Sequence, residues 1–93
     1  MILQVLGKRW KLRFVPHLHP YGECDSPDTK AKEIRIRASL RGEEKLDAIV
    51  HEMIHAAGWH IDEYFVNQLA TDIARTLWRL GYRDSRELLN LGG

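Results

Sequence analysis

The sequence predicts an α+β fold: a small sheet of three or more strands, antiparallel or mixed, packed on two helices, with a short third helix at the end. Three observations predict it. Apolar residues alternate with a period of two in residues 2–15 and 33–39, which is typical of strands. From residue 43 onward they recur at spacings of three and four, which is typical of helices. The length of 93 residues suits one small domain, so residues 1–93 are expected to form a single domain.

The first half of the chain is expected to contain a β-hairpin, a long loop and a third strand. In residues 2–15 the alternating positions before the break at Gly7-Lys8 are Ile2, Gln4 and Leu6, and those after it are Trp10, Leu12 and Phe14. Residues 16–32 hold all three prolines and many turn-forming residues, so they are predicted to form a loop. In residues 33–39, Ile34 and Ile36 alternate with arginines, which predicts a third strand paired with the hairpin.

The second half is expected to contain two long helices. The first covers residues 43–57, with an apolar stripe at Leu46, Ile49, Val50, Met53, Ile54 and Ala57. Gly58 is a plausible stop, and Asp62 is a candidate N-cap for a second helix at residues 63–80. The apolar stripe of this second helix is Phe65, Val66, Leu69, Ile73, Leu77 and Leu80, and Gly81 follows it. Asp84 is expected to cap a short last helix through Leu91.

Composition and charge exclude several classes of protein. Fourteen basic and 13 acidic residues give a net charge of +1, so no nucleic-acid partner is expected. No apolar run approaches the roughly 18 residues of a membrane-spanning helix, and basic residues interrupt the N-terminal apolar stretch, so we expect no membrane partner and no signal peptide. The single cysteine, Cys24, excludes an internal disulfide. A cytoplasmic location is therefore expected, while the oligomeric state is not indicated.

The string His51-Glu52-Met53-Ile54-His55 carries the main functional signal. On a helix, residues i and i+4 lie on one face, so both imidazoles can bind one zinc ion. Glu52 projects beside them and can act as general base toward a zinc-activated water. Chance produces this string only about 0.02 times in a chain of this composition. The alternative is a helix with two surface histidines, but its apolar spacing predicts the helix independently of them.

A catalytic zinc site needs a third protein ligand. His60, Asp62 and Glu63 lie downstream of the histidines. Glu63 is favoured because it lies in the first turn of the second helix, and a tight turn at Gly58 would fold that helix back against the first. His60, in the connecting turn, is the alternative ligand.

Other residues near the string are candidates for supporting roles. Asn67 lies one turn after Glu63 and could accept the free ring N–H of His51 or His55, or it could be simply solvated. A tetrahedral oxyanion needs a further donor, which Tyr64 or His60 could supply.

Cys24 lies in the predicted loop and has two interpretations. A thiolate is a strong zinc ligand, so a loop folded over the cleft could place Cys24 in the open position and keep the protein latent. The favoured interpretation is a small buried residue in a turn. His17 and His19 are expected to be loop histidines rather than a second metal site.

The motif resembles that of gluzincin-type zinc metallopeptidases, and locally that of their ImmA/IrrE-like branch. The matching pattern is His51-Glu52-x-x-His55 followed by Glu63-x-x-Val66-Asn67-x-Leu69-Ala70. The layout of a short sheet and two helices resembles the minimal catalytic domains called minigluzincins. The resemblance implies a Zn²⁺ cofactor bound by His51, His55 and Glu63, with Glu52 as general base. The chain departs from the branch at Val66 and Leu69, and its gap between His55 and Glu63 is short for the clan.

The expected activity is that of a zinc metalloprotease, a hydrolase that acts on a peptide or protein substrate. An extended peptide is expected to pair with a free edge of the strand at residues 33–39. In so small a domain the cleft is expected to be shallow and proteolysis restricted. The alternative is a zinc-binding regulatory or interaction module with the same fold and little or no proteolytic activity.

Overall fold

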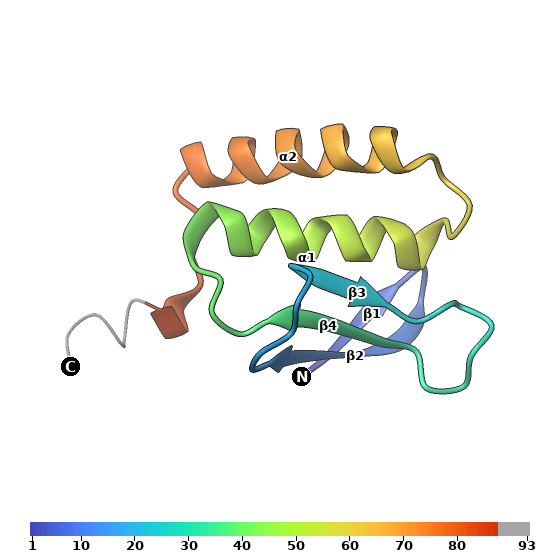
Figure 1. The fold of residues 1–93 in the computed structure, drawn as a ribbon. Helices are drawn as coiled ribbons and strands as arrows, with labels where there is room; N and C mark the ends of the chain where they lie inside the picture. The colour runs from blue at the N-terminus through green and yellow to red at the C-terminus, as the bar shows by residue number, and fades with distance from the viewer. Residues whose placement is uncertain (88–93) are drawn as a thin grey trace.

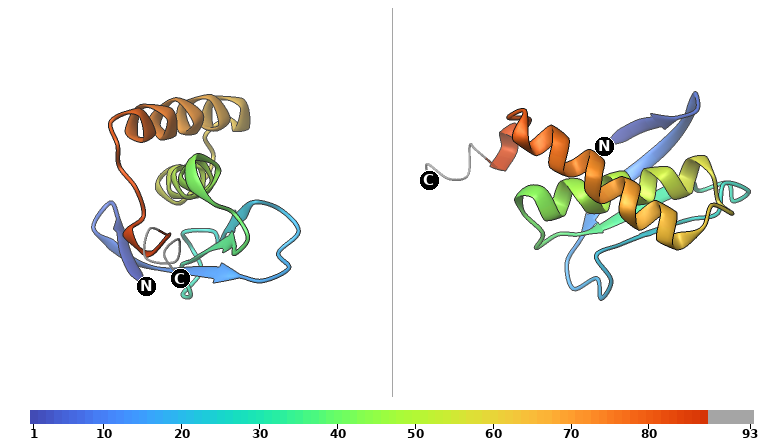
Figure 2. Two further views of the ribbon diagram at one scale, coloured as in Figure 1. Left: turned by 90° about the vertical axis from the view of Figure 1, so that its left-hand side faces the viewer. Right: turned by 90° about the horizontal axis from the view of Figure 1, so that it is seen from above.

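The computed structural model describes residues 1–87 and confirms the α+β fold, with two main helices and a four-stranded mixed sheet (Figure 1). In chain order the elements are β1 (Ile2–Val5), β2 (Lys8–Val15), β3 (Gly22–Cys24), β4 (Glu33–Arg37), α1 (Gly42–Ala57) and α2 (Glu63–Arg79). A helical turn at residues 85–87 begins the short C-terminal helix, and its predicted end at Leu91 lies outside the described residues. The sheet, α1 and α2 form three successive layers (Figure 2). No described helix combines the length and apolar character needed to cross a membrane.

The strand order β1-β2-β4-β3 places β4 inside the sheet, where it runs parallel to β2 and antiparallel to β3. The prediction that residues 33–39 offer a free edge is therefore wrong, because β1 and β3 are the edge strands. The prediction missed β3 because this strand has only three residues and lies within a segment rich in proline and turn-forming residues. The pairing of β4 with the hairpin is confirmed.

The hairpin turns at Leu6 and Gly7, one residue earlier than predicted. Both residues have positive φ, of 50° and 77°, as the favoured two-residue hairpin turns require. This turn sets which face of β1 is buried. Val5 and Leu3 pack toward the core, whereas Ile2 is exposed.

The core lies between the sheet and α1. The predicted alternation is confirmed in β2 and β4, where the buried residues are Trp10, Leu12, Ile34 and Ile36. These four pack with Ala48 and Ala56 of α1 in one apolar cluster. The short alanine side chains let α1 lie close to the sheet, and this brings the neighbouring turns of the helix against β3.

The helices pack through smaller residues than the sequence predicts. The fully buried residues of α2 are Val66, Ala70 and Ala74, whereas Phe65 and Leu69 of the predicted stripe are exposed, as is Leu80 at the helix end. Small residues allow closer approach of two backbones, so the contact face is offset from the stripe of largest apolar side chains. As a result, α1 is enclosed between the sheet and α2 (Figure 2).

The turn between α1 and α2 has well-defined chemistry. The side chain of Ile61 packs over Gly58, the predicted stop, where a Cβ would lie 2.3 Å from Cδ1 of Ile61. Asp62 is the predicted N-cap of α2, and its side chain accepts a hydrogen bond of 3.0 Å from the backbone N–H of Phe65. These contacts fold α2 back along α1 and place Glu63 in the first helical turn.

Candidate metal centre

Three metal-ligand atoms converge between the C-terminal half of α1 and the first turn of α2. His51 Nε2 lies 2.9 Å from Glu63 Oε1, and His55 Nε2 lies 2.8 Å from Glu63 Oε2. The two Nε2 atoms are 3.2 Å apart. Within residues 1–87, no other group of three or more histidine, cysteine or carboxylate side chains converges in this way.

The local sequence explains this convergence. His51 and His55 are one helical turn apart, so their rings project from the same face of α1. Both rings are largely buried between the helices. The side chain of Glu63 is 62% exposed and contacts both rings from the solvent side. Of the three downstream candidates, Glu63 joins the histidines, and Asp62 and His60 do not.

The donor set fits a catalytic zinc ion. Two imidazole nitrogens and one carboxylate are a known ligand set for catalytic zinc, which keeps a fourth position open. Tetrahedral ligands at 2.0–2.1 Å from zinc are roughly 3.3 Å from each other, and the two Nε2 atoms are 3.2 Å apart. Two imidazole nitrogens that face each other also need a proton or a cation between them. His51, His55 and Glu63 are therefore the residues that would hold the metal.

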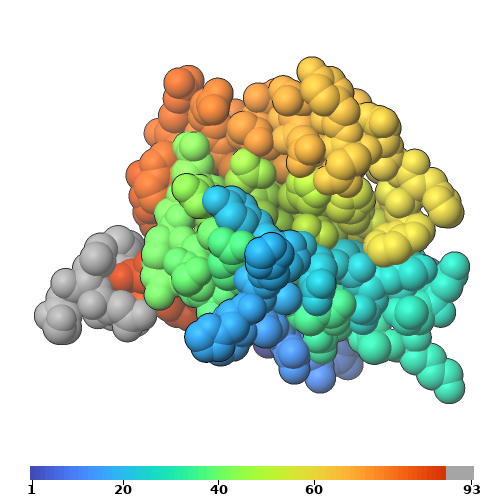
Figure 3. Space-filling view, viewed as in Figure 1, coloured from blue at the N-terminus to red at the C-terminus, as the bar shows by residue number. Residues whose placement is uncertain are grey.

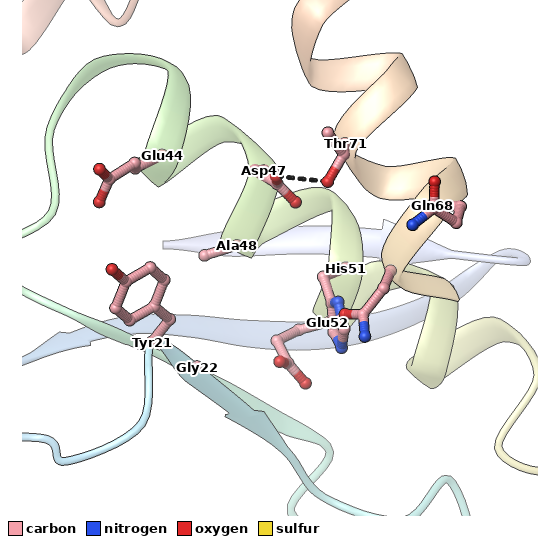
Figure 4. Close-up of a pocket in the computed structure, with 10 residues that line it drawn as sticks. Tyr21, Gly22, Glu44, Asp47, Ala48, His51, Glu52, Gln68 and Thr71 are labelled. Atoms are coloured by element: carbon pink, nitrogen blue, oxygen red, sulfur yellow. Dashed lines mark hydrogen bonds between the residues drawn. The ribbon is translucent and has the colours of Figure 1, made fainter. Parts of the chain in front are cut away.

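Glu52 lies on the side of α1 that faces the sheet and is only 7% exposed. Its side chain points toward Gly22 of β3 (Figure 4). Burial, assisted by the nearby carboxylates of Glu63 and Glu23, raises the pKa of Glu52 to about 7. This places a carboxyl group that can exchange a proton near neutral pH beside His51.

Gly22 is a site residue that sequence reasoning missed. A Cβ at this position would lie 3.0 Å from Cγ of Glu52, so the glycine leaves the space that the glutamate side chain occupies. The only available signal was a glycine in a segment predicted to be a loop, which is an ordinary place for glycine. Its role becomes visible only when β3 is placed beside α1.

A cavity of about 400 Å³ opens beside Glu52 and His51. It lies between α1, α2 and the start of β3, where Figure 3 shows α1 at the bottom of a hollow below α2. Its lining comprises Tyr21, Gly22, Glu44, Asp47, Ala48, His51, Glu52, Asn67, Gln68 and Thr71. Asp47 is held in place by a hydrogen bond of 2.9 Å that Thr71 Oγ1 donates to its Oδ2 (Figure 4).

The predicted supporting residues occupy different places. Asn67 lines the cavity, but among the described residues no hydrogen bond joins it to His51 or His55. Tyr64 is 72% exposed, and His60 is exposed in the turn between the helices. Neither hydrogen-bonds to the ligand residues within the described part of the chain.

Cys24 lies on β3 and not in a loop over the cleft. Its thiol donates a hydrogen bond to the backbone oxygen of Asp25 at 3.2 Å and packs against the apolar core. Burial, assisted by the carboxylates of Glu52 and Asp25, raises the pKa of Cys24 to about 12. The thiol stays protonated at neutral pH and lies outside the group of metal-ligand atoms, which favours the structural interpretation over latency.

Comparison of the chain with protein-family models, with curated proteins and with solved structures found no match. The chemistry of the site is therefore inferred from its own residues. These are three converging ligand side chains, a nearly buried carboxyl group beside them and an adjoining acidic cavity.

Proposed function

We propose that this chain is a zinc-dependent metallopeptidase that hydrolyses peptide bonds. In this proposal His51, His55 and Glu63 hold the zinc ion, and Glu52 acts as general base. The observation that carries it is the convergence of the three donor atoms next to the nearly buried carboxyl group of Glu52. The resemblance of the motif to gluzincin-type peptidases supports the same activity.

The protein's contribution to the chemistry centres on Glu52. When bound, zinc supplies Lewis acidity that polarises the scissile carbonyl and acidifies water. The Glu52 carboxylate takes a proton from the attacking water and then delivers it to the leaving amine. The burial that raises the pKa of Glu52 above that of an ordinary carboxyl group suits this role, because it makes the carboxylate a stronger base.

The edge of β3 is the proposed place where the substrate backbone binds, in place of residues 33–39. Tyr21 accepts a backbone hydrogen bond from β4, and Asp25 donates one to β4. Because hydrogen-bonding direction alternates along an antiparallel strand, the N–H and C=O groups of Gly22 and Cys24 point to the open side. An extended peptide can pair with these groups, and Gly22 would then hold it beside Glu52.

The test is proteolysis by the purified chain loaded with one equivalent of zinc. We expect cleavage of an unstructured protein, loss of cleavage in a chelator, and recovery when zinc is restored. His55→Ala is expected to lose both zinc and activity, whereas the matched variant His60→Ala keeps both. Tight zinc binding at the three ligands without cleavage would instead favour the regulatory or interaction module.

A further inference from the structure

The cavity beside Glu52 is strongly acidic. Three carboxylates of α1 line it, at Glu44, Asp47 and Glu52 (Figure 4). Among the described residues that line it there is no lysine or arginine, and His51 is already assigned to the metal. The cavity therefore favours a positively charged occupant.

The spacing of the carboxylates favours a long cation over a compact metal ion. At a rise of 1.5 Å per residue, Asp47 lies about 7.5 Å from Glu52 along the helix axis, and Glu44 lies about 12 Å from it. These three carboxylates do not form a metal-ligand group, because only His51, His55 and Glu63 do so within the described part of the chain. Carboxylates spread over this distance match an apolar stem that ends in a charge.

Glu52 also faces this cavity. Its side chain is more than nine-tenths buried, lines the cavity and has no hydrogen-bond partner within residues 1–87. Its carboxylate oxygens are not sealed from solvent, because none of the side-chain oxygen or nitrogen atoms in the described part of the chain is both fully buried and unpartnered, so they are open to a group that enters the cavity. Asp47, by contrast, is fixed by Thr71 and keeps its Oδ1 atom free for a ligand.

We propose that this cavity binds the side chain of a lysine or arginine in the peptide that the enzyme cleaves, close to the scissile bond. The inference rests on the proposed peptidase function and names its substrate class. The aliphatic stem lies along Ala48 and the ring of Tyr21. The guanidinium carbon of Arg37 packs over this ring, 4.8 Å from its centre. The ammonium or guanidinium group then pairs with Asp47 and Glu44.

The first arm of the test measures binding without hydrolysis. Metal-free protein, which cannot turn over, is titrated with acetyl-Ala₃-Lys-Ala₃-amide and with the same peptide carrying norleucine or glutamate in place of lysine, and NMR shifts are followed. Norleucine matches the lysine stem but lacks its charge. We expect the lysine peptide to bind about tenfold more tightly than the norleucine peptide, with the largest shifts at residues that line the cavity.

The second arm uses charge-neutralising variants. Asp47→Asn with Glu44→Gln is expected to abolish the preference for lysine over norleucine in binding. A matched pair, Glu43→Gln with Asp72→Asn, removes the same charge from positions that do not line the cavity and is expected to keep the preference. Equal binding of the lysine and norleucine peptides by the wild-type chain, or an unchanged preference in the cavity variant, would overturn the proposal.

Cleavage by the zinc-loaded protein separates this inference from the proposed function. A binding preference for lysine without cleavage of any peptide would refute the peptidase but support the cation pocket. Cleavage that is equally fast for lysine, norleucine and glutamate peptides would support the peptidase and overturn the pocket. Preferential cleavage next to lysine or arginine, lost in the cavity variant alone, is the result we expect.

Discussion

Replacing Gly22 by alanine tests how closely the edge strand β3 controls the position of Glu52, the proposed general base. The added Cβ would lie 3.0 Å from Cγ and 3.2 Å from Oε2 of Glu52, and 3.1 Å from Cδ1 of Ile36. Ordinary contacts between carbon atoms are about 3.5–4.0 Å, so the methyl group is about 0.5 Å too close on both sides. Ile36 is fully buried in the core, whereas Glu52 borders the cavity, so Glu52 is expected to move.

The expected consequences differ for activity, stability and zinc binding. A misplacement of about 1 Å in a catalytic group can cost about 100-fold in rate, so a shift near half that size is expected to lower kcat/KM at least about tenfold. Overpacking costs about 1–3 kcal/mol, and replacing a strand glycine returns about 0.5–1 kcal/mol, which leaves a net loss near 1 kcal/mol. Zinc affinity is expected to stay unchanged, because the nearest atoms to the methyl group belong to Glu52 and Ile36.

The assay compares kcat/KM, Tm and zinc content for Gly22→Ala and for Gly7→Ala. Gly7 has a φ of 77° with nothing within 4 Å of an added Cβ, so its variant is strained but far from the site. It is expected to lose stability and keep its activity per folded molecule. If Gly22→Ala retained full activity and full zinc, the claim that Gly22 positions Glu52 for catalysis would be refuted.

Three further predictions concern the ligands, the thiol and the C-terminal segment. Glu63→Ala is expected to weaken zinc binding more than about 100-fold, measured by competition with a chelator, whereas His60→Ala leaves it unchanged; equal losses would contradict the ligand assignment. Cys24→Ala is expected to keep wild-type activity and zinc content, and a gain in activity would support latency instead. Hydrogen bonds from Arg86 and Lys45 lower the pKa of Asp84, so its stabilising effect is complete above its unfolded pKa of about 4 and is lost as pH falls through the lowered value. Asp84→Asn should therefore be less stable than the wild type in urea at pH 7, with a difference that shrinks in acid; a constant difference would be contrary evidence.

The sequence was most informative where one local pattern determines one structure. Period-two alternation located β2 and β4, and the spacing of three and four residues located both helices within about one residue of their ends. Asp62 and Gly58 were identifiable because capping and turn chemistry depend only on neighbouring residues. The same local signals made Glu63 the favoured partner of the two histidines.

What the sequence could not predict depends on residues far apart in the chain. Three residues of β3 are too few to show a period, so the strand order and the identity of the free edge were missed. The role of Gly22 depends on which helix packs over it, and its neighbour Glu52 is 30 positions away. Likewise, the sequence does not distinguish Glu44 and Asp47 from ordinary acidic residues on the surface of a helix. Their place in a cavity depends on Tyr21 and α2, which enclose the space beside them.

The central claim is that zinc held by His51, His55 and Glu63 supports hydrolysis in which Glu52 moves the proton. Its most direct test is the rate of peptide hydrolysis by zinc-loaded Glu52→Gln, measured beside the wild type with zinc content determined on the same samples. We predict one zinc ion per chain in both proteins and at least about a 100-fold lower rate in the variant. A variant as active as the wild type, or two zinc-loaded proteins that are both inactive, would contradict the claim.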